Sequence, residues 1–285
     1  MEQRRIGNRT VGAIGLGAMP MSVREGQDEA QSVRAIAAAL EAGVTLVDTA
    51  DAYAPHEDSF GHNERLVAKA LKELGAGDDV LVATKGGHTR RGESWAIDGS
   101  PAYLREACLA SLDRLGVDRI GLYQHHRPDR HVPYEETMGG LKALHDEGLV
   151  EMVGISNADP DQIRTAREIL GDALVSVQNE LSPAFRSSLP EVELCAELGL
   201  AFLAWSPLGG ISKAAALGQE WEDFASVAHR HDVSPQQVAL AWELSLSPTV
   251  VPIPGASRPE SITDSARASE LRLDEDDLAR LNRTY

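Results

Sequence analysis

Residues 45–53 read TLVDTADAY, an apolar run that ends in polar residues. The run is too short for a helix and predicts a buried β-strand, with Asp48 at its end and Tyr53 just beyond it. Lys85 ends the similar run VLVATK, and His126 ends IGLYQHH. A parallel barrel gathers the C-terminal ends of its strands at one face, so these four side chains are expected to meet in one pocket.

Short apolar runs alternate with longer amphipathic ones along the whole chain, which is typical of repeated β–α units around a parallel sheet. Eight such strands are enough to close a barrel. The predicted strands are Ala13–Gly17, Thr45–Asp48, Val80–Thr84, Ile120–His125, Val150–Ser156, Leu174–Gln178, Leu200–Ser206 and Thr249–Pro252. We therefore expect an α/β fold, a (β/α)8 barrel of the TIM type, in a single domain over residues 1–285.

Several boundaries are marked by their residues. Ser-Pro pairs at 100–101 and 234–235 are typical of a helix N-cap followed by proline in the first turn. The opening IGNRTV predicts a β-hairpin that turns at residues 7–8 and covers the bottom of the barrel. Residues 86–99 and 207–221 are expected to be long irregular connections at the functional face, where they would form pocket walls.

Composition limits the class of partner. With 27 Lys and Arg against 44 Asp and Glu, the net charge of −17 disfavours nucleic acids and anionic membranes. Cys108 and Cys195 each lie among apolar neighbours and are expected to be core residues. No leader-like segment or apolar run of about 20 residues is evident, so we expect a cytoplasmic protein. No required protein partner is indicated.

The residue types at the strand ends suit proton transfer to oxygen. A tyrosine with a pKa of about 10 is a poor donor near neutral pH, and a nearby ammonium such as Lys85 lowers that value. Asp48 would keep the lysine charged, and His126 would donate a hydrogen bond to the substrate oxygen or to the Tyr53 phenol. Hydride addition to a carbonyl requires such protonation.

Physical reasoning leaves two of these assignments open. Asp51 competes with Asp48 for the role of counter-ion, and His125 competes with His126. Neighbouring residues of a strand point to opposite faces, so only one of the two histidines is expected to line the pocket.

Two other motifs do not support their usual functions. HHRPDRH, at residues 125–131, matches no compact zinc spacing, so no metal site is predicted. GAIGLGAMP resembles the dinucleotide fingerprint, but Pro20 stands where the third glycine belongs, which disfavours a Rossmann domain.

Small and polar residues follow the later strands instead. They occur in GISN, VQNE, WSPLGG and IPGASR, which end at residues 157, 180, 210 and 258. Amide and hydroxyl groups can pair with a carboxamide, an indole can stack on a nicotinamide ring, and glycine-rich loops leave room for a pyrophosphate.

The set VDTADAY, ATKGG, LYQHHRPD, VGISN, VQNELSP, AWSPLGG and IPGASRPESI closely resembles the aldo-keto reductases. These are (β/α)8 barrels that use NADPH without a Rossmann fold, and the resemblance runs in order over nearly the whole chain. It implies the reduction of an aldehyde or ketone to an alcohol by hydride transfer from the nicotinamide. It also implies that Tyr53 is the general acid, that Lys85 and Asp48 tune it, and that His126 is the histidine of the site.

The resemblance further implies the cofactor contacts. Arg258 matches a basic position that contacts the 2′-phosphate, which favours NADPH over NADH, and Asp264-Ser265 replace the Glu-Asn pair common at the adenine. The implied cofactor-binding residues are Ser156, Asn157 and Gln178 at the carboxamide, Trp205 on the ring, Ser206, Pro207, Leu208 and Gly209 at the pyrophosphate, and Pro254, Gly255, Ser257, Arg258, Asp264 and Ser265 in the last barrel loop and helix.

The expected substrate walls are Met19, Tyr53, His88 and Trp95, a mostly apolar lining suited to a hydrophobic or aromatic aldehyde or ketone. Two other functions are compatible with the same residues. The barrel could be an NADPH-binding regulatory subunit that reads redox state for another protein. It could also be a Schiff-base aldolase in which Lys85 is the nucleophile.

Overall fold

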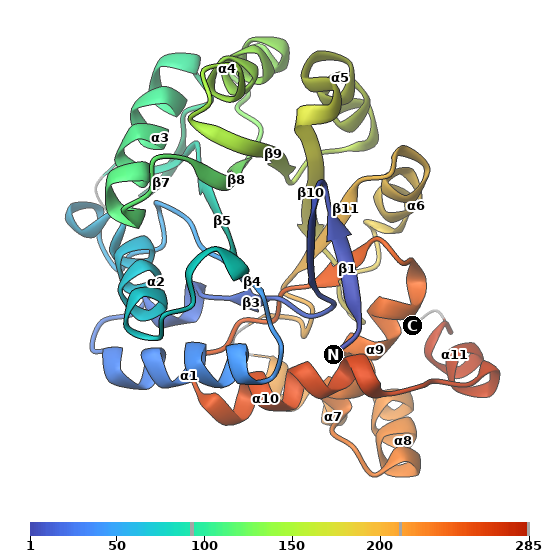
Figure 1. Ribbon diagram of the computed structural model, residues 1–285. Coiled ribbons are helices and arrows are strands. Elements are labelled where there is room, and N and C mark those ends of the chain that lie inside the picture. Colours follow the sequence, from blue (N-terminus) through green and yellow to red (C-terminus); the bar gives the residue numbers. More distant parts are fainter. Residues whose placement is uncertain (92–93, 211–212, 284–285) are drawn as a thin grey trace.

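Eight parallel strands form the centre of the molecule, and helices lie around them (Figure 1). The computed structural model describes residues 1–91, 94–210 and 213–283. The strands are β3 (Leu16–Gly17), β4 (Leu46–Asp48), β5 (Leu81–Gly86), β8 (Ile120–His125), β9 (Val150–Ser156), β10 (Leu174–Glu180), β11 (Ala201–Trp205) and β12 (Val250–Pro252). They pair in this order, which confirms the predicted (β/α)8 fold.

Backbone hydrogen bonds join the first strand to the last. The amide of Gly15 donates to the carbonyl of Pro252 at 2.9 Å, and that of Gly17 donates to Pro254 at 3.0 Å. Gly17 also forms a parallel bridge with Gly255. A Cβ atom at residue 17 would lie 2.9 Å from a backbone oxygen, so only glycine permits this close approach.

The helices that cover the strands begin at the predicted caps. Ser100 Oγ accepts a hydrogen bond from the backbone of Tyr103, and Ser234 Oγ accepts one from Gln237. The helices are α1 (Glu29–Glu41), α2 (His62–Glu73), α3 (Pro101–Leu115), α4 (Tyr134–Asp146), α5 (Pro160–Leu170), α6 (Leu189–Leu198), α7 (Leu217–Glu220), α8 (Glu222–His231), α9 (Pro235–Leu246), α10 (Pro259–Arg267) and α11 (Glu275–Leu281). In the described part of the chain, none of them is both long and apolar enough to cross a bilayer.

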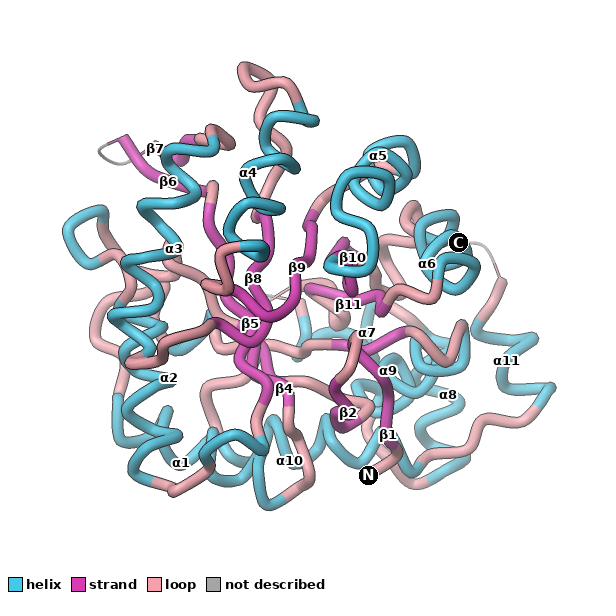
Figure 2. Tube along the Cα trace, turned by 45° about the horizontal axis from the view of Figure 1, so that its top comes forward, coloured by secondary structure: helices cyan, strands magenta, loops and turns pink. Residues whose placement is uncertain are grey.

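The predicted N-terminal hairpin is present at the bottom of the barrel. Strands β1 (Gln3–Ile6) and β2 (Arg9–Gly12) pair antiparallel, and Gly7 turns between them with φ of +55°. Ile6 and Val11 are buried in one apolar cluster with inward-facing strand residues such as Leu122. Figure 2 shows this hairpin at one end of the barrel and strands β6 and β7 at the other.

The prediction of two irregular connections is wrong in part. Residues 86–99 contain an antiparallel hairpin of β6 (His88–Arg91) and β7 (Ser94–Ile97). Residues 207–221 contain the 3-10 turn at Ala214–Ala216 and helix α7, while 211–212 lie outside the described residues. Few β-branched and aromatic residues occur in 88–97, so its strand signal is weak in the sequence.

Candidate active site

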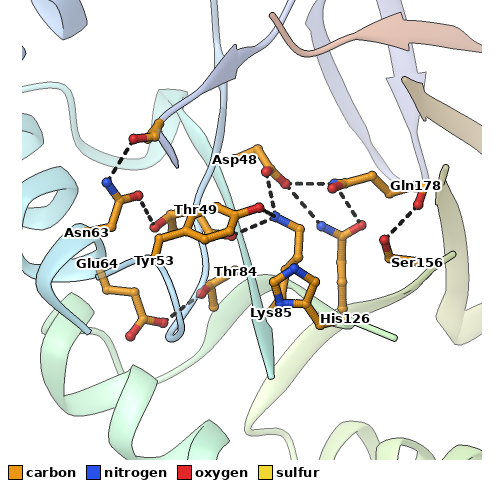
Figure 3. Close-up of polar contacts among 12 residues, drawn as sticks. Asp48, Thr49, Tyr53, Asn63, Glu64, Thr84, Lys85, His126, Ser156 and Gln178 are labelled. Atoms are coloured by element: carbon orange, nitrogen blue, oxygen red, sulfur yellow. Dashed lines mark hydrogen bonds and ion pairs between the residues drawn. The ribbon is translucent and has the colours of Figure 1, made fainter. Parts of the chain in front are cut away.

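Three of the predicted catalytic residues meet around the ammonium group of Lys85 (Figure 3). Its Nζ atom donates hydrogen bonds to Asp48 Oδ1 at 2.6 Å, to the carbonyl of Thr49 at 2.9 Å and to the Tyr53 hydroxyl at 3.0 Å. An ammonium group has three donors, and each has an acceptor here. The barrel thus places a phenol, an ammonium and a carboxylate in direct contact.

Asp48 keeps Lys85 charged although both side chains are almost fully buried, with exposed fractions of 3% and 1%. Burial by itself lowers the pKa of a lysine because it penalises the charged form. The attraction of Asp48, and then that of Tyr53, outweighs the burial, so the pKa of Lys85 lies above its ordinary value. The second Asp48 oxygen accepts from Gln178 at 2.7 Å and from Gln124 at 3.3 Å.

Tyr53 keeps its proton at neutral pH. Burial raises the pKa of Tyr53 above its ordinary value, and Lys85 offsets only part of this effect. The sequence predicts that the ammonium of Lys85 lowers this pKa, and that prediction is wrong for the net shift. The cost of burying a phenolate is larger than the attraction of one ammonium that is already paired.

His126 and His125 lie on opposite sides of the end of β8. The His126 ring lines the pocket, 5.7 Å from the Tyr53 ring between centroids. His125 lies outside the pocket lining and packs toward Tyr134, with a ring separation of 6.3 Å. Burial, followed by Lys85, lowers the pKa of His126 well below its ordinary value, so its ring is neutral. The structure therefore puts His126, and not His125, beside the phenol.

Asp51 is buried but forms no ion pair with Lys85 in the described structure, where Asp48 takes that place. Burial, and then the neighbouring Glu64, raises the pKa of Asp51 well above its ordinary value. The charged form of Asp51 is thus disfavoured. Asp48 is the counter-ion that the sequence left undecided.

A cavity of about 1050 Å³ opens beside the Tyr53 hydroxyl and extends to the first residues of α10. Nearly all predicted site residues line it. They are Met19, Asp48, Tyr53, His88, Trp95, His126, Ser156, Asn157, Gln178, Trp205, Ser206, Pro207, Leu208, Pro254, Gly255, Ser257, Arg258, Asp264 and Ser265. Lys85 lies behind this surface, in contact with Tyr53 and Asp48.

Amide oxygens and strained backbone face the cavity near His126. Gln178 donates through Nε2 to Asp48, which can only accept, so its Oε1 atom is the one left for a ligand. Asn157 Nδ2 donates to the His126 carbonyl at 3.0 Å and to Ser156 Oγ at 3.0 Å. Asn157 and Ser206 have φ of +57° and +51°, in the left-handed region that non-glycine residues adopt uncommonly.

Gly209 is the one predicted cofactor contact that lies outside the lining. Its amide donates to the Ser206 carbonyl at 2.8 Å and so closes the turn after β11. Gly210, with φ of +98°, faces the cavity instead. A cofactor contact at Gly209 stays a prediction, and its amide is already used within the turn.

The far end of the cavity lies at α10, where the sequence predicts contacts to the adenosine part of the cofactor. Arg258 is exposed at the N-cap of α10, and within the described part of the chain its guanidinium reaches only Ser261 Oγ, at 3.5 Å. Both oxygens of Asp264 already accept hydrogen bonds, from Ser234 at 2.7 Å and from Gln237 at 2.6 Å. An exposed guanidinium beside a helix N-terminus suits a phosphate.

Two cationic side chains of the wall were missed by the sequence analysis. Arg90, in β6, and Arg127, directly after His126, both line the cavity. Arg127 could have been expected from its place in HHRPD at the end of a predicted strand. Arg90 could not, because the sequence predicts an irregular connection over residues 86–99, where the hairpin lies. The lining is therefore less apolar than expected near His88 and Trp95.

Metal chemistry finds no support among the described residues, which contain no group of three or more His, Cys, Asp or Glu side chains placed to hold an ion. The predicted core cysteines are both buried as free thiols.

Comparison with known proteins identifies the family. Residues 13–285 match the model of the Aldo/keto reductase family. The chain belongs to this family. It is 35% identical to a probable aldo-keto reductase 1 of Glycine max, over 94% of this chain and 84% of that protein.

Solved aldo-keto reductases share the fold. A glycerol dehydrogenase from Gluconobacter oxydans is 26% identical, with a TM-score of 0.83 over 98% of this chain and 94% of that one. An aldo/keto reductase from Klebsiella pneumoniae, solved with NADP and acetate, is 27% identical, with a TM-score of 0.82 over 98% and 94% of the two chains. Aldo-keto reductases use NADPH, which confirms the predicted cofactor at the level of the family.

Proposed function

We propose that this protein is an NADPH-dependent reductase of aldehyde or ketone carbonyls in which Tyr53 is the general acid. The observation that carries the proposal is the contact between the Tyr53 hydroxyl and Lys85 Nζ, at 3.0 Å, beside the cavity. Membership of the family supports oxidoreductase chemistry. The carbonyl substrate and the role of Tyr53 as proton donor go beyond what family membership supports, and they are what we propose here.

The direction of the hydrogen bonds prepares Tyr53 to give its proton away. Because Lys85 donates to the phenol oxygen, the hydroxyl hydrogen of Tyr53 is available for an acceptor in the cavity. After the proton leaves, the phenolate oxygen lies next to an ammonium group that Asp48 holds charged. Positioned charge of this kind stabilises the product of proton transfer most effectively in a dry site.

His126 acts on the same oxygen. Its ring is neutral and has one N–H donor, and it lies edge-on to Tyr53 with an interplanar angle of 79°. A carbonyl oxygen between the two side chains would accept one hydrogen bond from each. The substrate is thereby oriented with its carbonyl carbon toward the amide-lined part of the cavity.

The residues at that part of the cavity fit NADPH. Gln178 Oε1 and the side chains of Ser156 and Asn157 offer groups for a carboxamide, and the buried Trp205 Nε1 has no partner among the described residues. The bound cofactor supplies a hydride to the carbonyl carbon. Arg258 and the N-terminus of α10 would hold its 2′-phosphate, which is our reason for preferring NADPH to NADH.

The aldolase function fits the geometry less well. A Schiff-base lysine must lose its proton to become a nucleophile. The pKa of Lys85 is raised, and its three N–H groups are already engaged with Asp48, Thr49 and Tyr53.

A cytoplasmic location stays a prediction from the sequence.

The test is a steady-state assay of NADPH consumption with 4-nitrobenzaldehyde. We expect turnover of about 1 per second or faster, as is ordinary for enzymes. Tight NADPH binding with no turnover of any aldehyde in a graded panel would instead favour the regulatory function. A borohydride-trapped adduct on Lys85, formed without nicotinamide, would favour the aldolase.

A further inference from the structure

Two arginines line the substrate wall of a protein whose net charge is −17. Arg90 and Arg127 come from different connections of the barrel and line the same cavity as His88 and His126. These two positive charges are not needed for the proton transfer, because Tyr53 supplies the proton and Lys85 the ammonium group. They indicate an anionic ligand in this part of the cavity.

The hairpin of β6 and β7 holds Arg90 firmly in the wall. The guanidinium donates to the carbonyl of Pro55 at 2.6 Å and to that of Ala54 at 3.2 Å, in the segment that directly follows Tyr53. It also lies over the Trp95 ring, 4.1 Å from the centroid. Carbonyl oxygens and an indole face orient the group but leave its full positive charge.

Arg127 is more exposed and adaptable. Among the described residues it makes no hydrogen bond or ion pair, and the carboxylate that acts on it electrostatically, Glu180, lies beyond salt-bridge distance and outside the cavity lining. Burial raises the pKa of Glu180, and Arg127 lowers it. The five N–H donors of Arg127 are therefore open to a ligand.

Both guanidinium groups act on the same histidine. Burial, followed by Arg127 and then Arg90, lowers the pKa of His88 to about 4. The His88 ring is thus neutral, stacks on Trp95 at 4.5 Å and meets the His126 ring at 4.8 Å. The positive charge of the two arginines therefore acts at the part of the cavity next to the reacting oxygen.

We propose that the site prefers carbonyl compounds that carry a carboxylate away from the carbonyl, and that Arg127 binds this carboxylate with Arg90 adding to the field. The proposal rests on the carbonyl reductase function above. A guanidinium pairs with a carboxylate through two parallel hydrogen bonds. The carbonyl would meet Tyr53 and His126, while the carboxylate would stay at the arginines.

The test compares two aldehydes that differ mainly in charge. The substituents of 4-carboxybenzaldehyde and 4-nitrobenzaldehyde are both planar with two oxygens, but only the first is an anion. The ratio of their kcat/KM values is measured for the wild-type protein and for Arg127→Met, Arg127→Lys and Arg130→Met. The two aldehydes differ in intrinsic reactivity, but this difference is the same for every variant. It therefore cancels when the ratio of a variant is compared with that of the wild-type protein. Arg130 is exposed, close in sequence and outside the cavity lining, so it is the matched control.

We expect Arg127→Met to lower the carboxylate-to-nitro ratio about tenfold, the loss of one charge-assisted contact. Arg127→Lys should keep most of the ratio, and Arg130→Met should keep all of it. High salt should reduce the wild-type ratio more than that of Arg127→Met, because ions screen an exposed guanidinium.

The possible failures can be told apart. An unchanged ratio in Arg127→Met, with both aldehydes still reduced, overturns the carboxylate proposal and leaves the reductase function intact. An equal fall in Arg130→Met means that only the long-range charge matters, and it also overturns the assignment to Arg127. No turnover of either aldehyde overturns the reductase function, and the substrate preference with it.

Discussion

The floor and the wall of the cavity differ in how their charged groups are paired. In the floor, Asp48, Tyr53 and Lys85 lie at or just beyond strand ends and satisfy one another's charges and donors. Asp48 and Lys85 are buried, and Tyr53 is half-buried. In the wall, Arg90 and Arg127 lie on connections, face the cavity and have no carboxylate within ion-pair distance among the described residues. The barrel thus fixes the chemistry, and the connections can select the substrate without disturbing it.

The two regions also differ in the free energy that it costs to remove their charged groups from water. Burying the Lys85–Asp48 pair removes two charges from water, and only close geometry and further hydrogen bonds offset that penalty. Gln178, Gln124 and the Thr49 carbonyl provide them. In the wall, Arg127 is exposed and keeps much of its hydration, so it can be exchanged at little cost. Floor variants should therefore slow all substrates alike, while wall variants should change which substrate is preferred.

The largest effect is expected for Tyr53→Phe, which would break the floor at its proton donor. Reduction of every aldehyde should fall about 10³-fold, because positioned proton transfer is worth 10² to 10⁴. NADPH affinity, measured by fluorescence titration, should stay within about twofold, since the phenol is no cofactor contact. The control is Tyr134→Phe, a half-buried tyrosine outside the cavity lining. Full activity in Tyr53→Phe would mean that another group donates the proton.

Asp48→Asn should lower kcat about 10²-fold at neutral pH, because it removes the charge that keeps Lys85 protonated. In the wild-type protein the pKa of Lys85 is raised, so activity that needs the ammonium persists up to alkaline pH. Without Asp48, burial dominates and that pKa falls. The pH profile of kcat should then lose activity at lower pH than the wild type does. If kcat of Asp48→Asn falls at the same alkaline pH as in the wild type, Asp48 is not the group that keeps Lys85 protonated.

The sequence predicted the floor better than the wall, for a physical reason. Asp48, Lys85 and His126 follow apolar runs that end at one face of any parallel barrel, so their meeting follows from topology. Arg90 is held by an exposed hairpin whose strands show little periodicity, and its contacts to the Ala54 and Pro55 carbonyls depend on tertiary structure. The net pKa shift of Tyr53 was also beyond the sequence, because it depends on how completely the phenol is buried.

Arg258→Ala extends the comparison to the far end of the cavity, where another arginine on a connection should again select between ligands. We expect NADPH to bind about tenfold more weakly and NADH to change by less than about twofold, since only NADPH has the 2′-phosphate. Arg267→Ala, at the exposed C-terminal end of the same helix, is the control. Equal weakening of both coenzymes would contradict the phosphate role.

The smallest effect concerns Asn63, which ties the floor to the loop before α1. Its Oδ1 accepts from Thr49 Oγ1 at 2.6 Å, and its Nδ2 donates to the Ala18 carbonyl at 2.9 Å and to Ser22 at 2.7 Å. Thr49 in turn supplies a carbonyl to Lys85. Asn63 is therefore a positioning residue for the ammonium, although it touches no ligand.

Asn63→Ala should lower kcat about fivefold for both the carboxylate and the nitro aldehyde, because a slightly misplaced floor slows proton transfer regardless of substrate charge. The unfolding free energy should fall by about 2 kcal/mol, since the Thr49 hydroxyl and the Ala18 carbonyl lose a buried partner. Ser22→Ala removes the third contact of Asn63, together with the hydrogen bond between Ser22 and His62, and should leave kcat unchanged. A fall in kcat confined to one of the two aldehydes would show that floor and wall are coupled, and the division between them would then be wrong.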